Sequence, residues 1–239
     1  MEFYQPWSPV IYKSEISKDF HTYIIDNVYR MLDYKKNAGH MLAGNIENQW
    51  QSRSIDQKRY EKFLKPHIIE YVNKIVSMRS KYHKFDSKST ELLFDVLRRD
   101  SNKYPFPITD YSQATDDNIR FEMGEGPWVN IQVANEFNPL HTHGGDLSGI
   151  IFIQIPEEIK NERIESDKEY TSLHGCLQFV RNDTLVFVEP KDMGILLFPA
   201  SLHHMVYPFK SDVERVTMSF NIGPILVGDN PLRIPQSLT

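Results

Sequence analysis

Two stretches of the chain carry residue types that can hold a metal ion. The first is Asn138-Pro139-Leu140-His141-Thr142-His143-Gly144-Gly145-Asp146. The second runs from His204 to Arg215, which follows it by eleven residues. Residues i and i+2 of an extended strand point to the same side, so His141 and His143 can face one point that His204 reaches from another strand. Imidazole nitrogens suit iron, zinc and copper, and a nearby carboxylate favours non-heme Fe(II). The pattern predicts a metal site with one side open to substrate and oxygen.

The third metal ligand stays open between two residues. His141 and His204 are the predicted members, His143 is favoured for the third place, and Asp146 is the alternative. Asp146 lies three residues past His143, so a turn at Gly144-Gly145 would have to fold it back toward the site. Asp146 could otherwise orient a histidine or be a turn residue.

An arginine near the end of the chain predicts an anion site beside the metal. Alternation along Glu214–Phe220 places Arg215, Thr217 and Ser219 on one strand face. An arginine that points into a barrel next to a hydroxyl group can bind a carboxylate through two parallel hydrogen bonds. A surface ion pair with Glu214 is the alternative interpretation of Arg215, and spacing alone does not separate the two.

The neighbour His203 competes with His204 for the distal ligand position. Adjacent strand residues point in opposite directions, so one of the two faces the metal.

These motifs resemble the Fe(II)/2-oxoglutarate-dependent oxygenases, in particular a prolyl-hydroxylase-like group with phage and bacterial members. The resemblance covers about residues 126 to 223. It rests on Asn138-Pro139-Leu140-His141-Thr142-His143, Leu147-Ser148-Gly149, and Gly194-Ile195-Leu196-Leu197-Phe198-Pro199 followed by His204, Arg215 and Phe220-Asn221. Spacing from Phe198-Pro199 in that pattern favours His204 over His203. The commonest pattern in the superfamily is His-x-Asp with a distal histidine, and here His143 stands at the Asp position.

The resemblance implies a double-stranded β-helix, or jelly roll, that binds Fe(II) and 2-oxoglutarate. It implies that O2 oxidises 2-oxoglutarate to succinate and CO2 while a substrate is hydroxylated. That substrate is unidentified, with a protein or amino-acid side chain as one candidate. Arg215 and Thr217 would anchor the co-substrate. Asn130 and Gln132 share a strand face, and Gln132 is the candidate for a further co-substrate contact because similar positions often carry a polar residue.

The first half of the chain has helical periodicity. Apolar residues recur at helical spacing within 14–36 and again within 60–75. Ser54 is the expected N-cap of the second helix, and Pro66 is expected to kink or split it.

The second half predicts β-structure. From Ile119 onward, eight short runs rich in β-branched and aromatic residues alternate with turn residues, as in a sandwich or jelly roll. The charged stretch 157–168 is expected to be a loop. The predicted fold class is α+β, with N-terminal helices packed on a jelly-roll core. We expect one domain over 1–239, made of a mainly helical N-terminal segment (1–115), the jelly-roll core (116–223) and a C-terminal extension (224–239).

The composition is that of an ordinary globular protein. Hydrophobic residues make up 40% and charged residues 25% of the 239 residues, and the net charge of -5 offers no electrostatic case for nucleic acid. Absence of a long apolar run, of a signal sequence and of a second cysteine besides Cys176 predicts a cytoplasmic protein without a membrane span. A homodimer through the helices is an open alternative.

Two other functions remain compatible with the sequence. A three-histidine iron site can serve a cupin-type dioxygenase whose substrate itself binds the metal. The same fold can also be a non-catalytic metal-binding jelly roll, because one fold hosts many functions.

Overall fold

The computed structural model describes residues 9–34, 44–51, 55–82, 113–124, 127–164, 172–181 and 184–232. Its helices are α1 (Lys18–Tyr34), α2 (Gln57–Tyr82) and α4 (Glu157–Ile164). Its strands are β1 (Tyr12–Glu15), β2 (Asn48–Gln51), β3 (Ile119–Met123), β4 (Trp128–Gln132), β5 (Asn138–His141), β6 (Leu147–Gln154), β7 (Leu177–Arg181), β8 (Thr184–Val188), β9 (Gly194–Pro199), β10 (His203–Val206), β11 (Arg215–Val227) and β12 (Asn230–Pro231).

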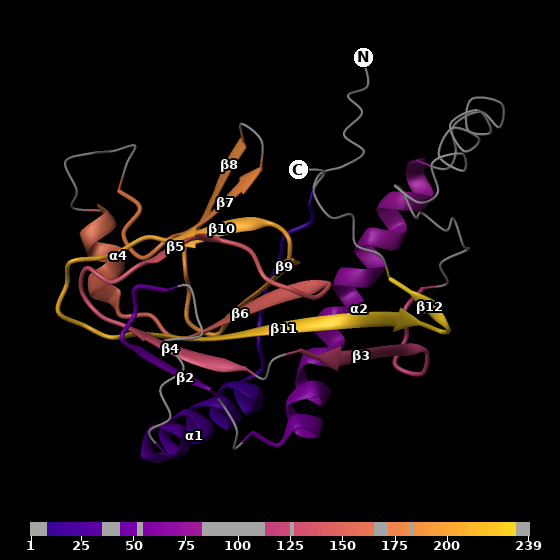
Figure 1. The fold of residues 1–239 in the computed structure, drawn as a ribbon, viewed down its shortest axis with the longest axis horizontal. Helices are drawn as coiled ribbons and strands as arrows, with labels where there is room; N and C mark the ends of the chain where they lie inside the picture. Colours follow the sequence, from indigo (N-terminus) through magenta and orange to yellow (C-terminus); the bar gives the residue numbers. More distant parts are fainter. Residues whose placement is uncertain are drawn as a thin grey trace.

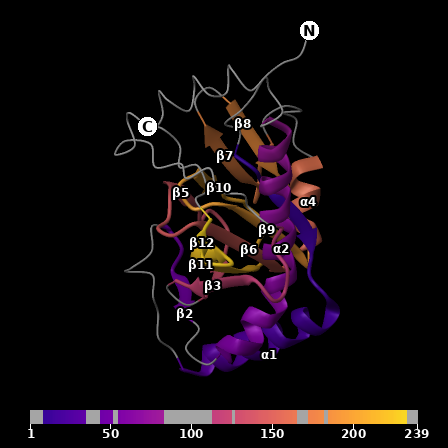
Figure 2. The same ribbon diagram turned by 90° about the vertical axis from the view of Figure 1, so that its right-hand side faces the viewer.

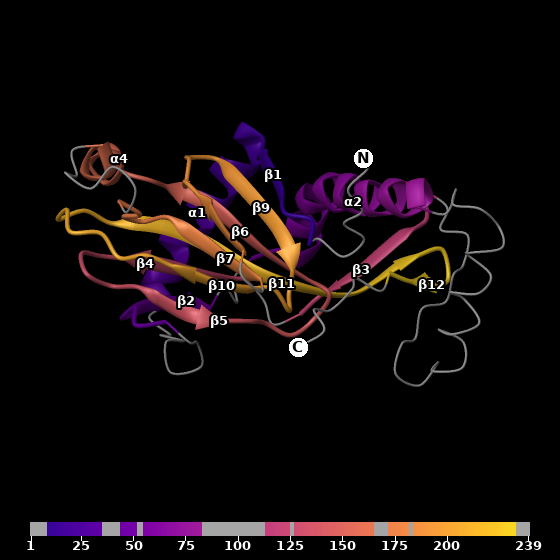
Figure 3. The same cartoon turned by 90° about the horizontal axis from the view of Figure 1, so that it is seen from above.

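The strands form two antiparallel sheets. The main sheet has the order β1-β9-β6-β11-β4-β2, and β3 and β12 pair with the distal portion of β11. The minor sheet has the order β5-β10-β7-β8. In Figure 1 the minor sheet lies above the main sheet, and seen from above its strands lie over β4 and β11 (Figure 3).

Alternation along β11 explains how the main sheet separates a helical layer from the minor sheet. Val216, Met218 and Phe220 are buried in the same cluster as apolar residues of α1 and α2. Arg215 and Thr217, which alternate with them, line a cavity shared with residues of the minor sheet. One strand therefore supplies apolar contacts to the helices and polar groups to the cavity.

Side-chain hydrogen bonds cap the N-terminal ends of α1 and α2. The Oγ of Ser17 accepts the backbone N–H of Phe20 at the start of α1, and the carboxylate of Asp56 accepts the N–H of Arg59 at the start of α2. The predicted cap Ser54 lies outside the described residues. Of the kink or split expected at Pro66, the split is wrong, because α2 runs through it without interruption.

The two helices cover one side of the main sheet. Figures 1 and 2 show α1 beneath it and α2 alongside β3. Phe20 of α1 stacks on Phe63 of α2 at 4.6 Å between ring centroids, and Tyr60 meets Phe220 of β11 edge-on at 5.9 Å. These aromatic contacts join both helices to the strand that carries Arg215.

All eight predicted strands are present, and one expectation needs correction. The segment 157–168, expected to be a loop, begins with the helix α4. Glu157 and Glu158 lie in its first turn, where negative charge stabilises a helix, and Ile159 is fully buried. The mostly charged composition suggested a loop, although the segment is a helix that packs through one apolar residue. Besides α1 and α2, the described part of the N-terminal segment 1–115 contributes β1 and β2 to the main sheet, and β11 continues past residue 223 to Val227.

No helix within the described ranges is long and apolar enough to cross a membrane.

Candidate metal centre

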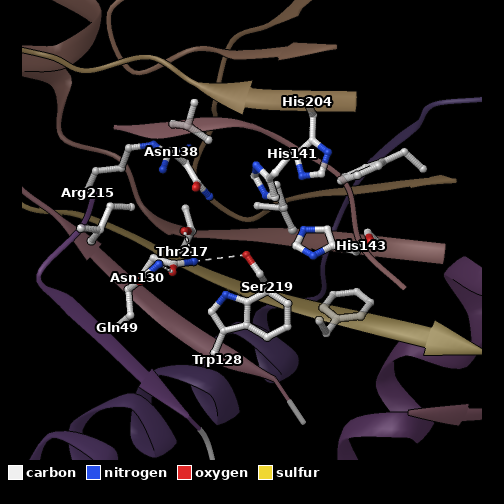
Figure 4. Close-up of a pocket in the computed structure, with 17 residues that line it drawn as sticks. Gln49, Trp128, Asn130, Asn138, His141, His143, His204, Arg215, Thr217 and Ser219 are labelled. Atoms are coloured by element: carbon white, nitrogen blue, oxygen red, sulfur yellow. Dashed lines mark hydrogen bonds between the residues drawn. The ribbon is translucent and has the colours of Figure 1, made fainter. Parts of the chain in front are cut away.

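Three histidines converge in the cavity between the two sheets. His141 ends β5, His143 follows two residues later, and His204 lies on β10 directly opposite His141. A ligand nitrogen from each lies within 4.8 Å of those from the other two, and the ring centroids of His141 and His204 are 4.3 Å apart. Figure 4 shows the three rings turned toward one another. The predicted histidines are therefore brought together by the fold.

Backbone carbonyls fix the tautomers of two of these rings. Nδ1 of His141 lies 2.6 Å from the carbonyl oxygen of Pro139, and Nδ1 of His204 lies 2.9 Å from that of Leu202. Because a carbonyl oxygen only accepts, each Nδ1 must carry the proton, and each Nε2 is left with a free lone pair. This is the usual arrangement around histidines that bind metals.

The environment keeps all three imidazoles neutral at physiological pH. Burial, with some repulsion from His141, lowers the pKa of His143 to about 4, and the same causes lower that of His204 to about 3. Burial also lowers the pKa of His141. Phe198 and Phe179 stand against the His204 ring and exclude water from it. Three neutral, clustered imidazoles fit a divalent transition metal, since protonated rings could not bind one.

Asp146 binds the backbone of β11 instead of taking the alternative role of a metal ligand. Its carboxylate accepts the backbone N–H of Ile225 at 2.8 Å, and its own N–H donates to the carbonyl of Ile222. Gly145, at φ 96°, makes the turn, and a Cβ there would lie 2.8 Å from the oxygen of Ile222. Among the described residues, the ligand cluster consists of the histidines without Asp146. The carboxylate holds the loop after His143 against β11.

Arg215 is buried at the other end of the cavity with donors unused. It is 2% exposed, and its Nε and Nη2 have no hydrogen-bond partner among the described residues. Nη1 donates to Oε1 of Gln132 at 3.1 Å, and the guanidinium lies 5.6 Å from the ring centre of Phe152. Burial lowers its pKa to about 10, so it stays charged at neutral pH. The alternative of a surface ion pair with Glu214 is excluded by this burial.

Gln132 supports Arg215 from outside the cavity lining. Its Nε2 donates to the carbonyls of Glu136 at 2.6 Å and Tyr207 at 3.3 Å, which directs its oxygen at the guanidinium. Thr217, in contrast, lines the cavity next to Arg215. Of the predicted co-substrate residues, two face the cavity and Gln132 holds one of them in place.

Gln49 and Asn138 also form this cavity wall, and neither was predicted from the sequence. Both line it with Asn130 and Ser219 (Figure 4). Asn138 belongs to the histidine motif, but its role there had no distinguishing signal. Gln49 comes from a four-residue strand with no apolar alternation. The preference for His204 over His203 agrees with the geometry, because His203 is exposed while His204 is 2% exposed.

Part of the sequence is similar to a known protein family. Residues 126–221, which hold the three histidines and Arg215, match the family model described as "Putative 2OG-Fe(II) oxygenase". The β-rich core of the chain matches the 2OG-Fe(II) oxygenases. No curated protein matches the sequence.

Solved structures of 2OG-Fe(II) oxygenases are similar at low identity. A Pseudomonas putida prolyl-4-hydroxylase aligns at 13% identity over 88% of this chain and 91% of its own, with a TM-score of 0.44. A Trichoplax adhaerens prolyl hydroxylase in complex with a hypoxia inducible factor peptide aligns at 11% identity over 92% and 83%, also at 0.44. A Burkholderia pseudomallei oxidoreductase of the 2OG-Fe(II) oxygenase family aligns at 11% identity over 44% of this chain and 45% of its own, at 0.34. At these scores the likenesses do not indicate a substrate.

Proposed function

We propose that this protein is a non-heme Fe(II)- and 2-oxoglutarate-dependent dioxygenase. It would hydroxylate a C–H bond of its substrate, with one atom of O2 entering the new hydroxyl group. The other oxygen atom enters succinate, which forms with CO2 from 2-oxoglutarate. The observation that carries the proposal is Arg215, a buried cation with two donor nitrogens that have no partner among the described residues, in the same cavity as three neutral histidines. A ligand that binds a metal at one end and ends in a carboxylate fits both features.

The metal ligands in this proposal are His141, His143 and His204. Bound there, Fe(II) would supply oxygen activation with positions left open for the keto acid and O2. Because the imidazoles are neutral, the protein ligands leave the 2+ charge of the metal uncompensated. A doubly negative keto acid therefore suits this site better than a neutral ligand.

Arg215 and Thr217 would hold the distal carboxylate of 2-oxoglutarate. The hydrogen bond to Gln132 fixes the guanidinium group. The edge that carries Nε and Nη2 is therefore already oriented for a ligand, and the side chain does not have to change rotamer to bind it. The Phe152 ring beneath it and the surrounding apolar residues exclude water, which strengthens a charge-assisted pair.

The finer description of the fold belongs to the same proposal. Two facing antiparallel sheets support a double-stranded β-helix core within a single domain over 1–239. A protein or amino-acid side chain as substrate, a cytoplasmic location, the likeness to a group with phage members and a homodimer remain predictions.

One observation favours a second candidate. The ligand cluster contains three histidines without a carboxylate, as in cupin-type dioxygenases whose substrate binds the metal directly. That function gives no role to the unused donors of Arg215, and neither does a non-catalytic metal-binding jelly roll. We therefore place both behind the 2-oxoglutarate-dependent function.

Turnover of the keto acid tests the proposal. Protein loaded with Fe(II) in air, with ascorbate as the reductant in place of the unidentified substrate, should release succinate from 2-oxoglutarate, and omission of Fe(II) should abolish this release. His204→Ala should lose it through the metal, and Arg215→Met through the co-substrate. Arg120→Met is the matched control, because Arg120 forms an exposed ion pair with Asp229 away from the cavity. Succinate release by Arg215→Met at the wild-type rate and wild-type KM would contradict the proposal.

A further inference from the structure

A residue outside the family match completes the polar wall of the cavity. Gln49 lies on β2, before the matched residues 126–221, and pairs with Asn130 across the β2–β4 ladder. It is 1% exposed, and its Nε2 donates to Oδ1 of Asn130 at 2.9 Å. Its Oε1, also buried, has no hydrogen-bond partner among the described residues, so the protein satisfies only the Nε2 end of this amide.

Asn130 accepts from Gln49 through its oxygen, and its nitrogen is therefore directed at two hydroxyl groups. Its Nδ2 donates to Oγ of Ser219 at 3.2 Å and lies 3.5 Å from Oγ1 of Thr217 (Figure 4). A hydroxyl that accepts in this way keeps its own proton for another acceptor. Both hydroxyl groups line the cavity together with Arg215, so their protons are available to a ligand there.

We infer that Gln49 is a positioning residue for the co-substrate. By donating to Asn130 it selects the amide orientation that leaves Thr217 and Ser219 as hydrogen-bond donors toward an anion. The N-terminal strand β2 thus contributes to selection of a dicarboxylic keto acid. This inference rests on the proposed function, and measuring metal and keto-acid binding separately distinguishes failure of one from failure of the other.

The direction of the network matters because an amide can face either way. If Asn130 turned over, its Oδ1 would accept the hydroxyl protons of Thr217 and Ser219 and withdraw two donors from the cavity. Gln49→Glu should impose this turned state, because a carboxylate only accepts and must receive Nδ2 of Asn130. Gln49→Met should leave Asn130 free to adopt either orientation.

The backbone beside Gln49 offers an independent perturbation. A Cβ on Gly44 would lie 3.0 Å from Nε2 of Gln49 and 3.3 Å from Oδ1 of Asn138. Gly44→Ala should therefore displace the Gln49 amide from Asn130 without changing its chemistry. We expect a smaller effect in the same direction as Gln49→Met.

The experiment measures keto-acid selectivity on protein loaded with Mn(II), which allows binding to be followed without turnover. Dissociation constants would be determined by calorimetry for 2-oxoglutarate and for 2-oxopentanoate, which has the same chain length but no distal carboxylate. Gln49→Glu should weaken 2-oxoglutarate by about tenfold or more, and Gln49→Met by less, as expected for loss of one or two hydrogen bonds to a charged group. Affinity for 2-oxopentanoate and for Mn(II) should stay within about threefold of wild type, a range set by the loss of less than one such hydrogen bond. Gln57→Glu, the same change at an exposed position on α2, is the control.

Each outcome decides between a positioning and a structural role. Equal losses for both keto acids and for Mn(II) would mean that Gln49 only supports the fold, and an unchanged selectivity in all three variants would overturn the inference alone. A wild-type protein that binds Mn(II) but neither keto acid would overturn the proposed function and this inference with it.

Discussion

Replacement of Arg215 by methionine separates co-substrate binding from metal binding and from stability. The substitution keeps a long unbranched side chain in a site where Arg215 is 2% exposed. It removes the two unpartnered donors Nε and Nη2, together with the bond to Gln132. We expect the loss of 2-oxoglutarate binding with little loss of iron binding, because the guanidinium and the histidines lie at opposite ends of the cavity.

The magnitude follows from the two unused donors. A hydrogen bond to a charged group contributes about 1.5–3 kcal/mol, so two of them correspond to at least about 3 kcal/mol. At about 1.4 kcal/mol per tenfold change, the Kd of 2-oxoglutarate should rise by about a hundredfold or more. The ligand-free variant should differ little in its free energy of unfolding, because relief of the buried charge of Arg215 offsets the donor lost to Gln132.

The assay combines calorimetry with urea unfolding. Wild type saturated at about 100 times its Kd should gain about 2.7 kcal/mol in the free energy of unfolding, and Arg215→Met at the same concentration should gain much less. Arg120→Met serves as the surface control. A variant Kd within about threefold of wild type, well below the loss expected for one charged hydrogen bond, would refute the reasoning. An equal loss of iron affinity would refute the assignment of Arg215 to the co-substrate.

The remaining predictions concern the ligands, pH and packing. His143→Ala should weaken Fe(II) binding far more than Asp146→Ala does. Asp146→Ala should mainly lower the free energy of unfolding, because the hydrogen bond from the Ile225 N–H is lost. Calorimetric metal titrations that show the reverse order of Fe(II) affinities would make Asp146 the ligand. Because the folded pKa is lowered to about 3 for His204 and to about 4 for His143, the unfolded chain takes up protons below about pH 6.5 that the folded chain does not. The free energy of unfolding of the metal-free protein should therefore fall between about pH 6.5 and 4, by up to about 1.4 kcal/mol per pH unit and histidine, and a profile from urea unfolding that is flat in wild type, or as steep in His204→Gln, would be contrary. A Cβ at Gly149 would lie 2.1 Å from the Phe220 ring, so Gly149→Ala should cost about 1–3 kcal/mol of stability, with partial rescue by Phe220→Leu; wild-type stability of the single variant would show that the ring can move.

The strands of the second half were predictable because each carries its own signal. The run Arg215–Ile222 alternates polar and apolar residues, and its two faces indeed meet different layers. The histidine convergence was predictable for the same reason, since His141 and His143 are two residues apart in the motif and His204 lies near the start of a comparable strand.

Features that depend on distant partners were not predictable. Gln49 and Asn130 are 81 residues apart, and no local pattern connects them. Asp146 could have served as a ligand or a turn residue by spacing, and only the position of Ile225 shows which backbone group it binds. The helix α4 was missed because its stretch has one buried apolar residue, Ile159, and is otherwise mostly charged. Tertiary contacts decided each of these cases.

The most direct test of the proposed function is an anaerobic titration of the Fe(II)-loaded protein with 2-oxoglutarate, followed by visible absorption. We predict a saturable metal-to-ligand charge-transfer band that disappears in His204→Ala and requires far more 2-oxoglutarate in Arg215→Met. No band in wild type, with one equivalent of iron bound, would contradict keto-acid binding at this centre.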